Sequence, residues 1–122
     1  MHDFENLEPF ECEVYDKNVK TAYIYISADR KTVKYKRFTQ GIRYLVPYAF
    51  DNPTLEQLYD FLESRCMDKR RTQLPEYLKL LGLDEYNPYE IVKITHGTMM
   101  EDFMWLKFPN ENITWEDVKL RD

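Results

Sequence analysis

The chain has 122 residues, of which 43% are hydrophobic and 16% aromatic, and its formal net charge is −5. This length suits one compact domain with an ordinary core and is short for two independent domains. The longest apolar run, residues 44–50, is far below the roughly 20 residues that a membrane-spanning helix needs. The acidic N-terminus has neither the basic nor the apolar region of a secretory signal, so we expect a cytoplasmic protein with no membrane partner.

Charge is segregated along the chain. Residues 1–16 contain acidic side chains but no Lys or Arg, residues 17–43 are basic apart from Asp29, and residues 84–122 are again acidic. The net negative charge argues against a surface that follows phosphates. A surface divided in this way suits a specific protein partner better than a polyanion.

The first third alternates apolar and polar residues with a period of two, which predicts three antiparallel strands joined by short turns. The expected strands are residues 10–15, 21–27 and 31–38. The side chains expected to face the core are Phe10, Cys12, Val14, Ala22, Ile24, Ile26, Val33 and Tyr35.

The opposite face of these strands would carry Tyr23, Tyr25, Lys34 and Lys36. A solvated sheet face is the simplest interpretation, and contact with a protein partner is the first functional one. Stacking of single-stranded nucleic acid on the tyrosines, with lysines at the phosphates, ranks behind because of the net charge.

From residue 51 the apolar spacing becomes helical, and three helices are predicted, each beginning near a proline. They cover residues 51–66, 73–82 and 86–97 and use Pro53, Pro75 and Pro88. Pro53 is expected in the first helical turn, Asn87 is expected to cap the third helix, and Gly82 and Gly97 are expected to end the second and third.

These elements predict a single α+β domain over residues 1–122. Residues 1–50 would form the β-meander, and residues 51–122 a mainly helical part with a late strand near residues 103–108. In that strand Phe103, Trp105 and Lys107 would lie on one side. Trp105 and Trp115 are expected in the core.

The polar cluster in residues 93–108 is best explained by helix ends. Lys93 and His96 would lie in the last turn of the third helix, where cations are favoured. Thr98 and Glu101 have the spacing of a capping box, with Asp102 near the same positive helix end, and Thr114 and Asp117 repeat that spacing beside Glu116. A catalytic pair of carboxylates is the weaker alternative for either acidic pair.

A basic group, Arg65, Lys69, Arg70 and Arg71, follows the first predicted helix. Attraction to the helix C-terminus explains it most simply, and a patch for an anionic partner is the functional alternative. Cys12 and Cys66 are expected to be buried, unpaired thiols. No metal-ligand spacing and no phosphate-binding or nucleophile motif is present, so we expect no metal, cofactor or catalytic residue.

Three stretches resemble the N-terminal region of HipA-like toxin kinases, in the same order: FLESRCMDKRRTQLPEYLKLLGL, ITHGTMMEDFMWLKF and ITWEDVKL. The second departs by one extra residue and by methionines where small polar residues and leucine are usual. The resemblance covers about half of the chain and includes no kinase body, so no catalytic residue is carried over. It implies a regulatory module of toxin–antitoxin or mobile-element type, similar to the small bacterial proteins that neutralise such a kinase.

The first hypothesis is therefore a non-enzymatic module that binds and modulates a partner protein such as a HipA-like kinase. Its expected contact residues are Tyr23, Tyr25, Lys34, Lys36, Arg70 and Arg71. The alternative is a small acidic inhibitor of a nucleic-acid-directed defence enzyme, of the anti-CRISPR kind, whose acidic termini occupy a basic channel. Nucleic-acid binding ranks third and enzymatic activity last.

Overall fold

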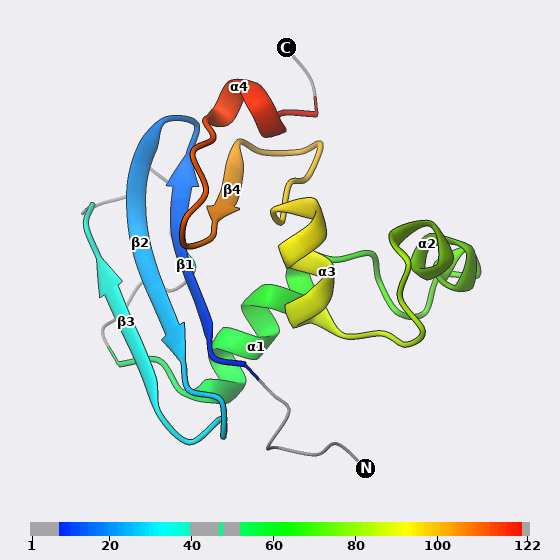
Figure 1. The fold of residues 1–122 in the computed structure, drawn as a ribbon, viewed down its shortest axis with the longest axis horizontal. Helices are drawn as coiled ribbons and strands as arrows, with labels where there is room; N and C mark the ends of the chain where they lie inside the picture. The colour runs from blue at the N-terminus through cyan, green and yellow to red at the C-terminus, as the bar shows by residue number, and fades with distance from the viewer. Residues whose placement is uncertain (1–7, 40–46, 48–51, 121–122) are drawn as a thin grey trace.

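The structure is a computed structural model, and it describes residues 8–39, 47 and 52–120. In chain order its elements are β1 (Phe10–Asp16), β2 (Val19–Ile26), β3 (Val33–Arg37), α1 (Leu55–Ser64), α2 (Leu74–Leu81), α3 (Pro88–Thr95), β4 (Met104–Lys107) and α4 (Trp115–Val118). The predicted α+β fold, with its three N-terminal strands and late strand, is confirmed (Figure 1). No helix within the described ranges is long and apolar enough to cross a bilayer.

The four strands form one antiparallel sheet in the order β3-β2-β1-β4. A two-residue turn joins β1 to β2, and its first residue, Lys17, has a φ of 53°. A bulge near Val14 and Tyr15 shifts the register between these strands, and the buried Thr21 hydroxyl donates to the Val14 carbonyl oxygen at 3.2 Å. In this strand order the late strand β4 pairs with the first strand, β1, and not with the third, β3.

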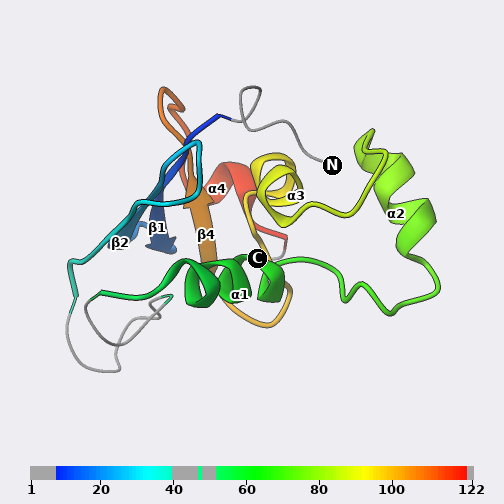
Figure 2. The same ribbon diagram turned by 90° about the horizontal axis from the view of Figure 1, so that it is seen from below.

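One face of the sheet forms the core with α1 and α3. The inward residues of β1 and β2 are at most 1% exposed, as the alternation predicted, and Leu58, Leu62, Ile91 and Val92 close the core from the helices. Val33 and Tyr35 are partly buried and pack against it. Helix α2 lies at the end of the molecule away from β3 (Figures 1 and 2).

The helix starts follow local capping chemistry. Thr54 caps α1, its hydroxyl accepting from the Gln57 amide at 3.1 Å while the Gln57 side chain accepts from the Thr54 amide at 2.8 Å. Pro53 thus precedes the cap, and its predicted place in the first turn is wrong because Thr54 completes the box instead. Asn87 caps α3 as predicted, and Gly82 ends α2 in the left-handed conformation.

The polar segment after α3 differs from the prediction. His96 itself takes the left-handed cap position with a φ of 59°, and Gly97 follows with a φ of 65°. No helix begins at Thr98, whose hydroxyl donates back to the Thr95 carbonyl oxygen at 3.0 Å, so the first capping box is wrong. The second is confirmed: the Asp117 carboxylate accepts from the Thr114 amide at 2.7 Å.

Candidate interaction surface

The candidate surface is the sheet face turned away from α1 and α3. The register between the strands brings its side chains side by side. Between β2 and β3, Tyr23 lies opposite Lys36 and Tyr25 opposite Lys34. Both lysines are exposed and both tyrosines half-buried. These four predicted contact residues therefore form two adjacent cross-strand pairs, as the alternation of each strand indicated.

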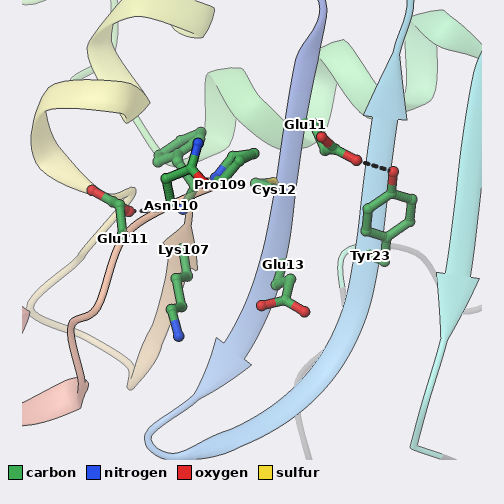
Figure 3. Close-up of a pocket in the computed structure, with 9 residues that line it drawn as sticks. Glu11, Cys12, Glu13, Tyr23, Lys107, Pro109, Asn110 and Glu111 are labelled. Atoms are coloured by element: carbon green, nitrogen blue, oxygen red, sulfur yellow. Dashed lines mark hydrogen bonds between the residues drawn. The ribbon is translucent and has the colours of Figure 1, made fainter.

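Strand β1 extends the same rows with carboxylates. Glu13 lies opposite Tyr23 and Glu11 opposite Tyr25, so each row runs from a lysine through a tyrosine to a glutamate. Figure 3 shows the Tyr23 hydroxyl donating a hydrogen bond to the Glu11 carboxylate. Burial and this bond raise the pKa of Tyr23 to about 12. We call the six residues of these rows, Glu11, Glu13, Tyr23, Tyr25, Lys34 and Lys36, the outer sheet face.

Lysine ammonium groups lie over aromatic rings around this face. The Lys34 ammonium lies 5.4 Å from the Tyr25 ring centroid, and the Lys36 and Lys20 ammonium groups lie 5.3 and 5.6 Å from that of Phe38. Phe38 stays 45% exposed. An exposed ring between two ammonium groups gives a binding surface apolar area with positive charge at its edge.

The β4 end of the same sheet side is closed. The Tyr15 and Trp105 rings stack with centroids 4.9 Å apart, and the Trp105 indole donates to the Lys17 carbonyl oxygen at 2.7 Å. Phe103 meets Trp115 edge-on, with centroids 5.8 Å apart. Trp105 and Trp115 are 1% and 7% exposed, so both are buried as predicted, and they close the β4 part of this face.

A pocket of about 300 Å³ opens where the outer sheet face meets the turn after β4 (Figure 3). Glu11, Glu13 and Tyr23 line it from the sheet, and Lys107 and Asn110 from the other side. Glu13 also pairs with Lys20 at 2.6 Å. The pocket thus presents carboxylates beside a lysine.

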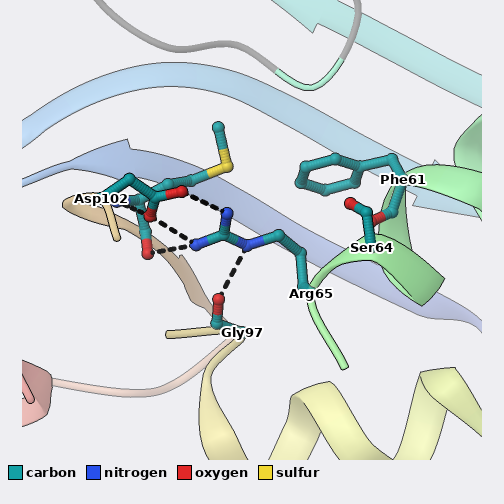
Figure 4. A network of polar contacts seen from close by, with 6 residues as sticks. Phe61, Ser64, Arg65, Gly97 and Asp102 are labelled. Carbon is teal, nitrogen blue, oxygen red and sulfur yellow. Dashed lines mark hydrogen bonds and ion pairs between the residues drawn. The ribbon is translucent and has the colours of Figure 1, made fainter. Parts of the chain in front are cut away.

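Arg65 ends α1 as its C-cap, at the helix end where the basic group was predicted, but its side chain is buried and structural (Figure 4). Its guanidinium donates to both Asp102 carboxylate oxygens at 2.7 and 2.8 Å, to the Gly97 carbonyl oxygen at 2.8 Å and to that of Met104 at 3.0 Å. Asp102 therefore anchors the entrance of β4 and does not stabilise a helix end as predicted. Sequence reasoning missed the pair because 37 positions separate its members.

The remaining cations of that group lie in the connection between α1 and α2, apart from the outer sheet face. Arg70 pairs with Asp68 at 2.9 Å, and the Arg70 guanidinium lowers the pKa of that carboxyl well below its usual range. Arg71 is exposed in the same connection. The predicted contact set is thus divided: the fold brings Tyr23, Tyr25, Lys34 and Lys36 together but does not bring Arg70 and Arg71 to them.

Several other residues of chemical interest have structural partners. His96 Nε2 lies 2.8 Å from the Glu111 carboxylate, whose second oxygen accepts from the Phe108 amide at 2.7 Å. Glu101 and Glu116 are exposed, and Glu116 pairs with Lys119 at 2.7 Å. Sequence reasoning did not predict the His96 and Glu111 pair, which the chain forms only by returning past α3.

Both cysteines are unpaired and buried, as predicted. Burial is the main cause that raises the pKa of each thiol, to about 12 for Cys66, so neither is an activated nucleophile. Within the described ranges, no group of His, Cys, Asp and Glu is placed to hold a metal ion.

Comparison with known proteins finds no matching family model, no matching curated protein and no matching solved structure.

Proposed function

We propose that this protein is a non-enzymatic interaction module that binds a partner protein through its outer sheet face and modulates that partner. One observation carries the proposal. The two rows of lysine, tyrosine and glutamate are continuous across three strands, with the lysines exposed and the tyrosines and glutamates half-buried, while α1 and α3 pack on the other side of the sheet. An antiparallel sheet can be stable with only one face covered by other elements, so the side chains on the opposite face can serve recognition.

The chemistry of the face suits a protein surface. Tyr23 and Tyr25 contribute rigid apolar area with few rotatable bonds, and Tyr23 is further fixed by Glu11. Lys34 and Lys36 lie on the β3 side and the carboxylates on the β1 side. A partner with acidic groups opposite β3 and basic groups opposite β1 would bind in a single orientation.

The same arrangement weighs against nucleic acid as the partner. Glu11 and Glu13 lie next to the tyrosines on which bases would stack, and they would repel the phosphates that the lysines attract. Binding to nucleic acid would therefore be weak and would fall steeply with salt, whereas binding to a protein partner that also packs on the tyrosines would fall less steeply, because salt screens only its charge contacts.

The acidic-inhibitor hypothesis gains no specific support. Part of its acidic N-terminus, residues 1–7, lies outside the described residues. Of the C-terminal acidic side chains, Asp102 binds Arg65, Glu111 binds His96 and Asp117 caps α4. These carboxylates serve the fold, which leaves fewer of them to imitate a phosphate chain.

The sequence resemblance suggests a HipA-like kinase as the partner, and we propose a kinase of this class as the protein that the outer sheet face binds. The first experiment is affinity capture of the tagged protein from its host at moderate salt, with a nuclease-treated control, followed by a binding titration with the purified partner. The proposal is supported if a kinase of this kind co-purifies both with and without nuclease treatment. Loss of every partner on nuclease treatment contradicts it in favour of nucleic acid.

The surface is tested by reversing two of its charges with Lys34→Glu and Lys36→Glu together. We expect the affinity to fall by about tenfold or more, because both lysines would then repel the acidic groups of the partner. The matched control is Lys69→Glu with Lys93→Glu, which changes the net charge equally at two weak ion pairs on the helical side, with N–O distances of 3.9 and 3.7 Å. Equal affinities for the two double variants would exclude the outer sheet face as the interface.

A further inference from the structure

A second concave surface lies on the helical side of the molecule, where a groove of about 610 Å³ runs between α2, α3 and the α4 region. Most of its lining is apolar: Met67, Tyr77, Ile94, Met99, Ile113, Val118 and Leu120. Ile94 and Leu120 are 45% and 51% exposed, so the groove leaves apolar area in contact with water. Its methionines are flexible enough to adapt to an inserted apolar side chain.

The charge available at the groove is negative. Asp117 lines it and is exposed while it caps α4, whereas Glu111, which also lines it, is engaged by His96 and the Phe108 amide. Arg65 also lines it, but the Arg65 guanidinium is occupied by Asp102 and two backbone carbonyl groups. The groove therefore complements an apolar side chain that has a cation next to it.

Helix α2 of the same chain presents such a pair. Leu80 is 87% exposed, the most exposed of the large hydrophobic residues within the described ranges, and the preceding residue, Lys79, is also exposed. Leu80 follows Tyr77 by three positions, about one helical turn, and Tyr77 forms the α2 wall of the groove. An apolar projection thus lies on the element that borders the apolar groove.

We propose that the groove binds a second copy of this chain, with Leu80 of each copy inserted into the groove of the other. A projection and a complementary groove side by side on one chain become self-complementary under a two-fold axis, since each copy then gives and receives the same contact. Lys79 of each copy would lie near Asp117 of the other. An isolated exposed leucine is ordinary on a protein surface, and the proposal depends on the matching groove and charge.

This contact uses none of the residues of the outer sheet face, so the dimer would present two such faces to partners. Self-association goes beyond the proposed function, and neither depends on the other: charge reversal at Lys34 and Lys36 leaves the dimer unchanged, and disruption of the dimer leaves the sheet face intact.

Sedimentation velocity of the whole chain, from low concentration to roughly 100 µM, tests the proposal, because that upper limit reaches weak specific dimers. We expect reversible dimerisation of the wild type. Leu80→Lys should raise the dimer dissociation constant by about tenfold or more, since each copy loses a buried leucine and gains a charge in an apolar groove. The control Met100→Lys, at a side chain that is 53% exposed and does not line the groove, should dimerise like the wild type.

A mixing experiment tests the contact specifically, even if a single variant does not dimerise for a reason unrelated to the groove. Ile94→Lys changes the groove, Leu80→Lys changes the projection, and each alone should be monomeric while its circular dichroism stays native. Mixed together, they should form a heterodimer that retains one intact contact. A wild type that remains monomeric at roughly 100 µM, or a mixture that forms no heterodimer, overturns the proposal and assigns the groove to another occupant.

Discussion

Removal of the Arg65 side chain should destabilise the folded protein strongly. The residue is 8% exposed, and its guanidinium satisfies the Asp102 carboxylate and the carbonyl oxygens of Gly97 and Met104. Arg65→Ala removes the guanidinium from these acceptors, of which Asp102 keeps the Met104 amide as a donor, and it removes a packed aliphatic stem. Each orphaned carbonyl costs about 1 kcal/mol, and loss of the charged partner and of packing adds about 1–3 kcal/mol. We expect a total of about 3–5 kcal/mol, towards the lower end because Asp102 keeps a quarter of its side chain exposed.

Urea unfolding followed by tryptophan fluorescence measures this loss, because Trp105 and Trp115 are both buried in the folded state. With a slope of about 1–3 kcal/mol per molar urea, the midpoint should fall by roughly 2 M while the slope stays unchanged. Arg65→Lys should lose about half as much, since an ammonium cannot reproduce the forked contact with both carboxylate oxygens.

A double-mutant cycle with Asp102→Asn separates the ion pair from the carbonyl contacts. We expect a coupling free energy of about 1–3 kcal/mol between the two positions. A loss below about 1 kcal/mol for Arg65→Ala, or additivity of the two single changes, would refute the reasoning that this pair holds the entrance of β4 against α1.

Two further predictions concern backbone strain and the thiols. Gly97→Ala should destabilise the protein by about 2–3 kcal/mol in the same urea assay and Gly82→Ala by only about 1 kcal/mol. Both have positive φ, but a Cβ at Gly97 would lie 3.2 Å from Leu106 Cγ, whereas one at Gly82 would meet nothing within 4 Å, so equal losses would contradict this account. Both thiols should resist Ellman's reagent at pH 8 until urea is added, and stability should fall as pH rises above about 9, because the folded state keeps the Cys66 proton up to a pKa of about 12 while the unfolded chain releases it. Rapid labelling of the native protein, or stability that is constant between about pH 8 and 10, would contradict the buried thiols.

Much of the fold could be predicted because its signals are local. Alternation over a few residues places Cys12 and Val14 on one face and Tyr23 and Tyr25 on the other, since successive side chains of a strand point to opposite sides. Helix starts are equally local: Asn87 and Pro88 specify the first turn of α3 by themselves. The wrong placement of Pro53 also has a local cause, because Thr54, one position later, caps the helix.

Pairing between distant segments could not be predicted in this way. Nothing in residues 103–108 specifies that β4 lies beside β1, where Glu13 meets Lys107 and Tyr15 stacks on Trp105. For the same reason sequence reasoning placed Asp102 at a helix end. A carboxylate near a helix start is common, and its contact with Arg65 exists only after the chain has closed.

The sequence alone therefore determined the strands, most helix ends, the buried tryptophans and the tyrosine–lysine pattern of the outer sheet face, because these depend on neighbours within a few positions. Only the tertiary structure decided that Arg65 is internal, that Arg70 and Arg71 lie away from Lys34 and Lys36, and that a groove borders the exposed Leu80. Those outcomes depend on how α1 and α3 pack against one sheet face and on where α2 lies beyond them, and contacts between elements remote in sequence are set by the shape and burial of whole surfaces.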